Sequence, residues 1–371
     1  MKIALLGHGI VGSGVTSILE DGKIEGIEVA KILTKRKRDR KDERYTLDFD
    51  EIKNDPDIDT VVECMGGETP SYAYVKECLS KGKNVVSANK MLLARHPDLF
   101  ETAERNGVCL LAEASTAGGI PWIKELGRIS RNDEIVSVSG IFNGTCNYIL
   151  SKIFEEGMSF REALTQAQEN GYAESDPSDD LCGYDTRYKL VLSILYAFHK
   201  TVPYDKIPAR GIEHLSDRAI EYGKQNGCVL KLIGSCFVRE EKLQAYVLPC
   251  FIRQEDLFAK VNENNNIVNL QSKYLGSLSL IGQGAGSLPT GEAIIQDLLD
   301  LREGSAQSVR IAGSGQIDDG PEGVFYVISK AKSLERFIDQ RIDEESFLSI
   351  RCPLKTILEE LREEDFIALT A

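Results

Sequence analysis

The chain has 371 residues, of which 42% are hydrophobic and 27% charged, so it is long enough for two or three domains with ordinary globular composition. Its formal net charge of −14 argues against nucleic acid as a partner, because phosphate binding needs a basic surface. No apolar stretch has the length needed to cross a bilayer, which excludes a membrane protein of the helical class. The nine cysteines form no CxxC pair, which indicates reduced thiols and a cytoplasmic location.

The first third of the chain alternates short apolar runs with helical patterns, as parallel βαβ units do. We expect strands at 2–6, 28–34, 60–64, 84–87 and 108–113, and helices at 11–19, 71–81 and 96–106. This alternation predicts an α/β fold with a doubly wound, Rossmann-type parallel sheet over residues 1–122.

Beyond about Pro121 the pattern changes to that of an α+β domain. Alternating segments predict antiparallel strands at 134–140, 242–251 and 277–281, with helices at 160–170, 186–199 and 217–226. We assign residues 123–284 to a substrate-binding and dimerisation domain whose sheet is open to a second copy, so we expect a homodimer. A helix at 293–301 would return to the first domain, which therefore also includes about 285–304. Residues 305–371 would form a small C-terminal α/β appendage.

The segment Gly7–His8–Gly9–Ile10–Val11–Gly12 fits the dinucleotide-binding pattern G-x-G-x-x-G. It follows a predicted strand and opens a predicted helix. The glycines Gly7, Gly9 and Gly12 would allow a tight turn and close backbone approach, and the helix N-terminus would attract a pyrophosphate. The alternative is a tight βα turn that binds no nucleotide.

The second predicted strand ends in the basic run Thr34–Lys35–Arg36–Lys37–Arg38. NAD enzymes usually place an acid there for the ribose hydroxyls. Lys35 and Arg36 instead suit a 2′-phosphate, so the sequence predicts NADP as the preferred cofactor, with NAD as the alternative. A solvated basic loop without a ligand is the other interpretation.

Two further segments follow predicted parallel strands, at the edge where open α/β sheets bind ligands. Ser87–Ala88–Asn89–Lys90 ends in a lysine that would be unremarkable on a surface. Glu113 ends the fifth predicted strand and precedes the glycine-rich run Ser115–Thr116–Ala117–Gly118–Gly119. A carboxylate in that position can ligate a cation together with backbone carbonyls, or it can cap the next helix.

Residues 171–190 read GYAESDPSDDLCGYDTRYKL and concentrate carboxylates before an apolar run. Asp185 and Lys189 are spaced i, i+4, so they share one face of a predicted helix. The apolar residues at 190–195 point around nearly the whole helix, which predicts that this helix and Lys189 are buried. An exposed helical ion pair is the simpler interpretation, but it leaves the neighbouring acids unexplained.

Taken in order, several long motifs make the chain resemble the homoserine dehydrogenase family over roughly residues 1–305. After the dinucleotide loop come S-A-N-K, E-A-S-x-x-G-G-I-P, G-I-F-N-G-T-x-N-Y-I-L, G-Y-A-E-x-D-P-x-x-D, G-x-D-x-x-x-K-L and G-A-G-x-x-P-T. The resemblance implies an NAD(P)-dependent enzyme that interconverts aspartate 4-semialdehyde and homoserine, on the route to threonine, methionine and isoleucine. No kinase domain precedes the loop, so the resemblance is to the monofunctional form.

The resemblance also implies roles for the matching residues. Lys189 would be the proton donor, assisted by Lys90. The substrate's ammonium group or its ordered waters would be held by Glu174, Asp180 and Asp185. The cofactor would be lined by Gly9, Ile10, Val11, Gly66, Ser87, Lys90 and Gly284. A structural cation, often sodium in this family, would be bound by Glu113 and the backbone carbonyls of Thr116, Gly118 and Ile120.

Some positions depart from the family pattern. Cys146 and Cys182 stand where many members carry threonine and glutamate or asparagine. Thr116–Ala117 replaces the usual valine–glycine pair, and Thr186 replaces a frequent alanine. The charged residues are intact, so the departures bear on substrate selectivity. Two alternatives stay open: a paralogue that reduces another small amino-acid semialdehyde, and a catalytically silent NADP-binding sensor.

Many members of the family end in an ACT domain that binds an amino acid and carries a D-x-P-G turn after its first strand. Residues 305–371 offer only Asp318–Asp319–Gly320–Pro321–Glu322–Gly323, and it lies before a predicted strand at 324–329. Another strand is expected at 347–351 and a helix near 354–363. We therefore expect a degenerate ACT-like segment or an unrelated appendage, with little or no inhibition by threonine.

Overall fold

The computed structural model describes residues 1–35, 42–318 and 320–370. Its contacts divide the chain into two compact units. Unit 1 consists of Met1–Asn132, Val191–Thr201 and Gln283–Gly313. Unit 2 consists of Asp133–Leu190, Val202–Gly282 and Ser314–Ala371. The domain boundaries proposed from the sequence, with a separate C-terminal appendage, stay a prediction.

Within the described residues, unit 1 is built on a parallel sheet of six strands in the order β3-β2-β1-β4-β5-β6. The strands are β1 (Lys2–Leu6), β2 (Glu28–Leu33), β3 (Tyr45–Thr46), β4 (Thr60–Glu63), β5 (Asn84–Ser87) and β6 (Leu110–Leu111). The strand order reverses between β1 and β4, and sheets of this type bind ligands at that point. The predicted Rossmann-type sheet is therefore confirmed, and β3 is an additional edge strand.

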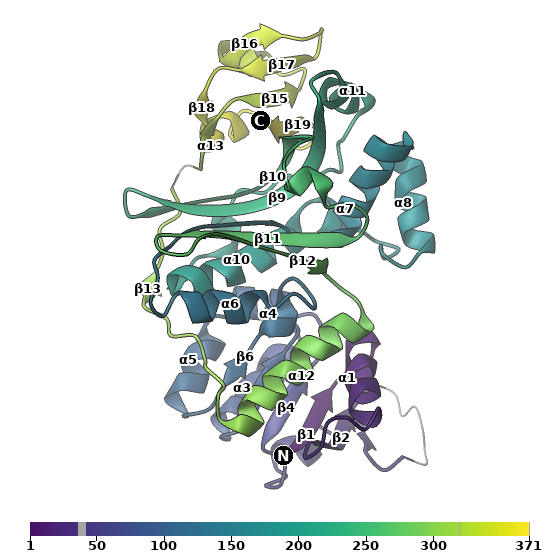
Figure 1. Cartoon of the computed structure of the whole chain (residues 1–371), viewed down its shortest axis with the longest axis vertical. Coiled ribbons are helices and arrows are strands. Elements are labelled where there is room, and N and C mark those ends of the chain that lie inside the picture. The colour runs from purple at the N-terminus through teal and green to yellow at the C-terminus, as the bar shows by residue number, and fades with distance from the viewer. Residues whose placement is uncertain (36–41, 319, 371) are drawn as a thin grey trace. The chain divides into compact units, whose positions relative to one another are not determined.

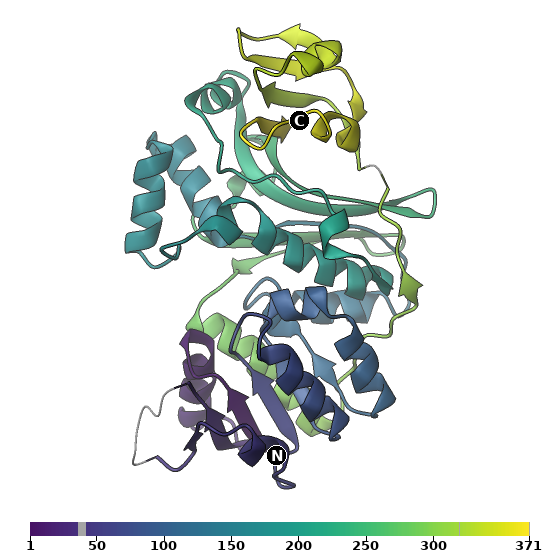
Figure 2. The same ribbon diagram turned by 180° about the vertical axis from the view of Figure 1, so that it is seen from behind.

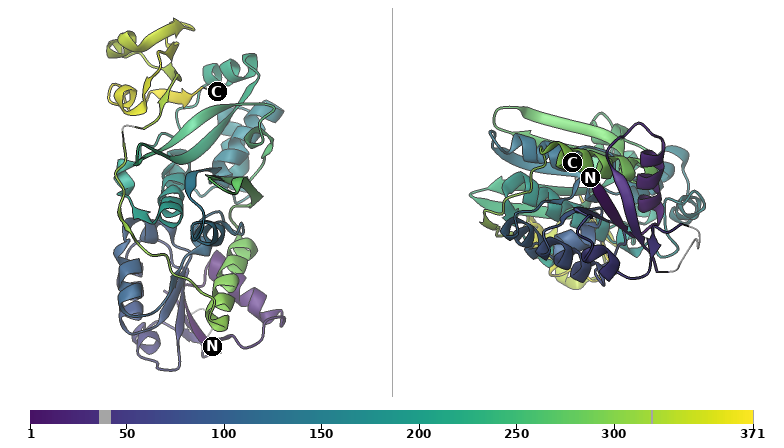
Figure 3. Two further views of the ribbon diagram at one scale, coloured as in Figure 1. Left: turned by 60° about the vertical axis from the view of Figure 1, so that its left-hand side comes forward. Right: turned by 90° about the horizontal axis from the view of Figure 1, so that it is seen from below.

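Helices cover both faces of this sheet. On one face, α1 (Ile10–Glu20) packs against α12 (Ser287–Glu303), as Figure 1 shows. The opposite face carries α3 (Ser71–Ser80) and α5 (Asp98–Arg105), which come forward in Figure 2. The left view of Figure 3 shows the sheet between the two layers. A Cβ on Gly14 would lie 2.1 Å from the carbonyl oxygen of Ser287, so α1 and α12 can approach this closely only because residue 14 is glycine.

Unit 2 contains, in the described part of the chain, a nine-stranded sheet in the order β12-β11-β7-β9-β10-β19-β15-β17-β16. Its predicted strands are β7 (Ile135–Ile141), β10 (Lys242–Arg253) and β12 (Gly276–Gln283). Two long strands were not predicted, β9 (Cys228–Arg239) and β11 (Asn265–Ser272). β9 and β10 form a continuous antiparallel hairpin, and β12 lies at the edge of the sheet.

The helices of unit 2 include α7 (Gly144–Ser151), α8 (Phe160–Glu169), α9 (Ser178–Leu181) and α11 (Asp217–Gln225). α10 (Tyr184–Phe198) begins in unit 2, and its residues from Val191 onward belong to unit 1. All of these helices except α7 and α9 match segments expected from the sequence. None of the helices among the described residues is long and apolar enough to span a membrane.

The C-terminal residues continue the sheet of unit 2. β15 (Phe325–Ile328), the 3-10 helix η5 (Lys332–Phe337), β16 (Ile338–Arg341), β17 (Ser346–Ser349), α13 (Leu354–Leu358) and β19 (Phe366–Leu369) follow one another along the chain. Their strands lie in the order β19-β15-β17-β16 and pair antiparallel. This is a short form of the ferredoxin-like βαββαβ motif. β19 also pairs in parallel with β10, at Leu369 and Cys250, so the motif shares one sheet with the rest of the unit.

Candidate active site

The turn between β1 and α1 has the shape that a dinucleotide needs. Gly7 has a φ of +97°, and a Cβ there would lie 2.9 Å from the carbonyl oxygen of Cys64. A Cβ on Gly12 would lie 2.5 Å from the carbonyl oxygen of Gly7. Gly9 is different, because a Cβ there would meet no atom within 4 Å, and it is exposed next to Ile10 at the start of α1. The first and third glycines are therefore required by packing, whereas the second leaves the approach to the helix N-terminus open.

The loops after β4 and β5 are joined by a buried carboxylate that the sequence analysis did not single out. Glu63 ends β4 with 0% exposure and accepts hydrogen bonds from Ser87 Oγ (2.7 Å) and the Met65 amide (2.9 Å). Burial raises the pKa of Glu63 above its usual value. The available signal was an acid at the end of the otherwise apolar strand T-V-V-E. Ser87, predicted to line the cofactor, thus has its hydroxyl engaged by Glu63.

Asn89 connects the same two loops to the helix that carries Lys90. Its Nδ2 donates to the carbonyl of Gly67 (2.7 Å), and its Oδ1 accepts from the Leu92 amide (3.1 Å), which caps α4 (Lys90–Arg95). Gly66 is exposed with a φ of +72°, and Lys90 is half-buried as the first residue of α4. The structure therefore places Gly66, Ser87 and Lys90 at the same edge of the sheet, as predicted.

The basic run after β2 is described only in part. Lys35 is exposed directly after Thr34, which follows the last residue of β2. Arg36 lies outside the described residues. The 2′-phosphate contacts expected of Lys35 and Arg36 therefore stay a prediction.

Glu113 begins a short 3-10 helix, η1 (Glu113–Ser115), so the expectation that it ends a strand was wrong. β6 ends at Leu111, and the Glu113 side chain turns toward the next helix instead. Glu113 is 2% exposed, and its carboxylate accepts from the amides of Ile123 (3.2 Å) and Lys124 (2.7 Å) at the start of α6 (Trp122–Ile129). Burial and the nearby Asp297 raise the pKa of Glu113 to about 8. The helix-cap interpretation of Glu113 is thus borne out.

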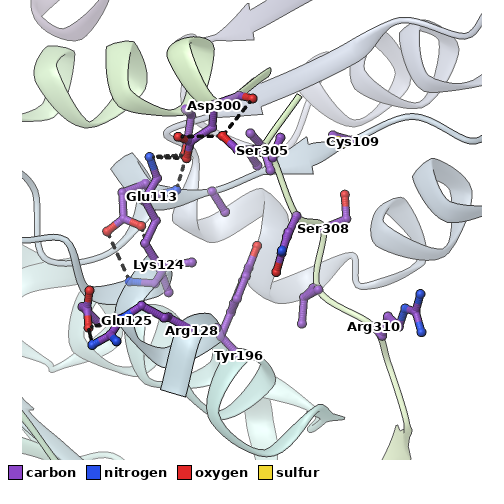
Figure 4. Close-up of a pocket in the computed structure, with 18 of the residues that line it drawn as sticks. Cys109, Glu113, Lys124, Glu125, Arg128, Tyr196, Asp300, Ser305, Ser308 and Arg310 are labelled. Atoms are coloured by element: carbon purple, nitrogen blue, oxygen red, sulfur yellow. Dashed lines mark hydrogen bonds and ion pairs between the residues drawn. The ribbon is translucent and has the colours of Figure 1, made fainter. Parts of the chain in front are cut away.

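Figure 4 shows these groups at the wall of a cavity of about 1000 Å³ within unit 1. Lys124 Nζ forms ion pairs with Asp300 (2.7 Å) and Asp297 (3.5 Å), and Tyr196 extends into the cavity. Burial also raises the pKa of Asp297, to about 7. The cavity therefore lies beside three acids, Glu113, Asp297 and Asp300. Lys124 and the raised pKa values of Glu113 and Asp297 partly neutralise their charge.

The glycine-rich loop after Glu113 touches the second glycine-rich loop of the chain. Ala117 and Gly118 have φ values of +61° and +59°, and a Cβ on Gly118 would lie 2.4 Å from the carbonyl carbon of Gly284. Thr116 is fully buried, and its Oγ1 has no hydrogen-bond partner among the described residues. Gly118 and Gly284, predicted for different ligands, are thus brought into direct contact.

In unit 2, Asp185 and Lys189 form the buried pair that their spacing predicts. The Lys189 Nζ to Asp185 Oδ2 distance is 2.8 Å, and the two residues are 7% and 4% exposed. Lys189 also donates to the carbonyl of Phe142 (2.6 Å). The apolar residues after Lys189 are buried as expected, with Leu190, Leu192 and Ile194 at 0% exposure. The interpretation as an exposed surface ion pair is therefore wrong.

Asn143 joins the predicted acids and was missed by the sequence analysis. Its Nδ2 donates to Asp180 Oδ1 (2.6 Å) and to Asp185 Oδ2 (2.8 Å). Its Oδ1 accepts from the amide of Cys146 (2.7 Å), so Asn143 is also the N-cap of α7. The signal was its place just before a helix, where asparagine is favoured.

Glu174 is the remaining residue predicted to bind the substrate, and Cys146 and Cys182 are the two cysteines that depart from the family pattern. Glu174 is exposed, and its backbone carbonyl accepts from Gln168 Nε2 (3.1 Å). The Cys146 thiol donates to the carbonyl of Asp180 (3.2 Å), and burial raises its pKa well above the usual value. Burial, assisted by Glu213, raises the pKa of Cys182 to about 11. Both cysteines are therefore neutral thiols beside carboxylates at neutral pH.

A Rossmann-type sheet with an open glycine turn is typical of dinucleotide-dependent oxidoreductases. Residues 7–113 match the family model described as homoserine dehydrogenase, NAD binding domain, and residues 121–299 match that of homoserine dehydrogenase. The chain belongs to the homoserine dehydrogenase family. Its activity is accordingly the reversible hydride transfer between aspartate 4-semialdehyde and homoserine.

Individual relatives agree with this assignment. The chain is 37% identical to the homoserine dehydrogenase of Synechocystis sp. over 81% of its own length and 73% of the relative's. The crystal structure of a homoserine dehydrogenase from Thiobacillus denitrificans matches with a TM-score of 0.86 at 27% identity, covering 100% of this chain and 98% of that one. A hyperthermophilic archaeal homoserine dehydrogenase in complex with NADPH shares the fold at 20% identity, with a TM-score of 0.72 over 83% of this chain and 99% of that one. Neither of the two alternative functions is favoured by these matches.

Proposed function

We propose that this homoserine dehydrogenase uses Lys189 as the proton donor, assisted by Lys90, and binds the substrate's ammonium group through Glu174, Asp180 and Asp185. The observation that carries the proposal is the buried Asp185–Lys189 pair, in which the ammonium is 2.8 Å from the carboxylate. When bound, the nicotinamide cofactor supplies the hydride to the carbonyl carbon. The carbonyl oxygen gains negative charge in that step, and Lys189 gives it a proton.

The carboxylates of unit 2 have a proposed role in binding the substrate. A substrate ammonium group needs anionic partners, and Asp180 and Asp185 are held side by side by Asn143. Glu174 is exposed and precedes α9, so it can close on the substrate's ammonium from the solvent side. Cys146 and Cys182 add no charge to this group, because burial keeps both thiols protonated.

The experiment that tests the proton donor is the Lys189→Ala variant. Loss of a general acid lowers kcat by about 10²–10⁴-fold. The dissociation constant for NADPH, measured by fluorescence titration, should change little because the residues proposed to bind the cofactor belong to unit 1. A Lys189→Ala enzyme with near-normal kcat would show that this lysine is structural and would transfer the donor role to Lys90.

For the cofactor, the open approach at Gly9 supports a bound pyrophosphate, and the basic run at Lys35 and Arg36 supports NADP over NAD. Hydrogen bonds to charged groups are each worth about 1.5–3 kcal/mol. The double variant Lys35→Ala/Arg36→Ala should therefore lose the preference, measured as the ratio of KM for NAD to KM for NADP. An unchanged ratio would show that the basic run is only a solvated surface.

A monovalent cation such as sodium fits beside Glu113, with the carbonyls of Thr116, Gly118 and Ile120 as further ligands. The support is chemical: the carboxylate is buried, its pKa is raised to about 8, and the neighbouring Thr116 Oγ1 lacks a partner within the described ranges. Oxygen ligands of this kind suit a hard cation. A cation there would stabilise the ionised form of Glu113.

We also propose a homodimer and a cytoplasmic location. β12 is an edge strand of the unit 2 sheet, and Ile281 on it is 53% exposed, which leaves a strand edge for a second copy to cover. All nine cysteines lie within the described residues and are free, as expected in a reducing compartment.

A further inference from the structure

Asn143 lies where β7 leads into α7, and its side chain is almost completely enclosed. It is 3% exposed, and each polar atom of its amide has a partner. Oδ1 accepts from the Cys146 amide at 2.7 Å, and this bond fixes which end of the amide carries the oxygen. Nδ2 must therefore point at the two carboxylates, and its two N–H groups serve one each.

This arrangement holds two like charges together. Asp180 comes from α9 and Asp185 from the first turn of α10, and without a shared donor the two carboxylates would repel each other. The distances of 2.6 Å and 2.8 Å are those of short hydrogen bonds to charged acceptors. Asp185 Oδ2 accepts from both Asn143 and Lys189, so the position of the amide also determines where the ammonium lies.

The residue before Asn143 fixes the ammonium from a second side. The carbonyl of Phe142 accepts from Lys189 Nζ (2.6 Å) and from Asn266 Nδ2 (2.9 Å). The Phe142 carbonyl contacts Lys189, and the Asn143 side-chain amide contacts Asp185. Residues 142 and 143 together therefore contact both members of the pair. Because the α7 cap fixes the Asn143 side chain, the start of α7 and the pair are coupled.

We propose that Asn143 is the positioning residue of the proposed substrate site in unit 2: it sets the separation of Asp180 and Asp185 and, through Asp185, the placement of the Lys189 ammonium. The inference rests on the roles proposed above for these three residues. Asparagine meets both requirements at this position. Serine would cap the helix but could not bridge the acids, and aspartate would cap the helix but add a third negative charge.

The test uses Asn143→Ser and Asn143→Asp. Both keep an N-cap for α7, so the fold should survive. Two hydrogen bonds to charged groups are lost in Asn143→Ser, and we expect kcat to fall about 10-fold to 100-fold with a higher KM for homoserine. Asn143→Asp should lose more, because repulsion replaces attraction. The NADPH dissociation constant should stay at the wild-type value in both.

The matched control is Ser159→Ala, which removes the N-cap of the exposed helix α8 without touching the acids. It should lower the melting temperature but leave kcat and the homoserine KM unchanged. Wild-type kcat and KM in either Asn143 variant would overturn the proposal, as would a loss of activity matched by an equal loss of NADPH affinity.

Lys189→Ala, assayed in parallel, separates this inference from the proposed function. If Lys189→Ala retains activity while Asn143→Ser loses it, the donor assignment fails but the positioning of the acids stands. If Lys189→Ala loses kcat while both Asn143 variants are unaffected, the donor assignment stands and the positioning role fails.

Discussion

Lys231 is a buried cation held by neutral oxygens. It lies on β9 with 2% exposure, and its Nζ donates to Asn147 Oδ1 (2.9 Å), the Val261 carbonyl (2.8 Å) and Asn262 Oδ1 (3.0 Å). Asn147 is on α7, in the same G-T-C-N-Y segment that follows Asn143. Burial lowers the pKa of Lys231 from 10.5 to about 8. Lys231 therefore links α7 to the sheet, and the free-energy cost of burying its ammonium group depends on pH.

That cost predicts a pH-dependent stability. Between pH 8 and 10.5 the unfolded chain binds a proton at Lys231 that the folded chain does not, so the stability contributed by this group rises with pH across that window. Each pH unit is worth at most about 1.4 kcal/mol. The free energy of unfolding of the wild type, relative to Lys231→Met, should therefore increase from pH 7.5 to 9.5 in urea titrations. A difference that stayed constant, or that fell, would contradict the lowered pKa.

At the level of elements, local patterns were predicted well and long-range pairing was not. The β1–α1 turn was recognised because its glycines act within six residues, and α10 because its apolar residues surround the helix. β9 was missed because Cys228–Arg239 is buried on both faces and does not alternate. β3 has only two residues, Tyr45–Thr46, which is too short for any period.

The same difference between local and long-range contacts holds for the residues of the candidate site. Asp185 and Lys189 were predicted because they are four residues apart on one helix, whereas Glu63 and Asn143 act on residues 24 to 42 positions away. Contacts of that range depend on how the strands and helices pack, which single-sequence patterns do not contain. Such residues have a local signal only at element ends: Glu63 closes a strand, and Asn143 opens a helix.

The glycine turn gives a prediction that separates packing from ligand binding. Gly9→Ala introduces a Cβ into open space at a φ of −89°, so the fold should be unaffected. The added methyl group would occupy the approach to the N-terminus of α1, and NADPH should bind at least 10-fold more weakly because a close backbone contact is lost. Gly12→Ala is the matched comparison, since its Cβ would meet the Gly7 carbonyl oxygen at 2.5 Å and should lower the melting temperature. Unchanged NADPH affinity in Gly9→Ala would place the pyrophosphate elsewhere.

On the scale of the whole chain, the C-terminal motif from β15 to β19 is part of the unit 2 core. Phe325 and Val327 on β15 pack in one apolar cluster with Ile233 of β9 and with Tyr246 and Leu248 of β10. An independent regulatory domain would have a core of its own, whereas this motif shares both sheet and core with β9 and β10 of unit 2. The shared core indicates that the motif contributes to the stability of unit 2. That threonine inhibits little or not at all stays a prediction.

Phe325→Ala tests whether this core is shared. Phe325 is fully buried, and replacing a buried phenylalanine by alanine costs about 3–5 kcal/mol. Because the cluster extends into β9 and β10, the loss should appear as a lower melting temperature of the whole unit 2, together with a higher homoserine KM, while NADPH affinity is retained. Ile342→Ala, at a position in the same segment that is 40% exposed, is the matched control and should change the free energy of unfolding by no more than about 0.5 kcal/mol. Hydrogen exchange distinguishes the alternative. If Phe325→Ala unfolded the C-terminal segment alone and left the amide protection of β9 and β10 unchanged, the motif would be an attached domain that unfolds independently.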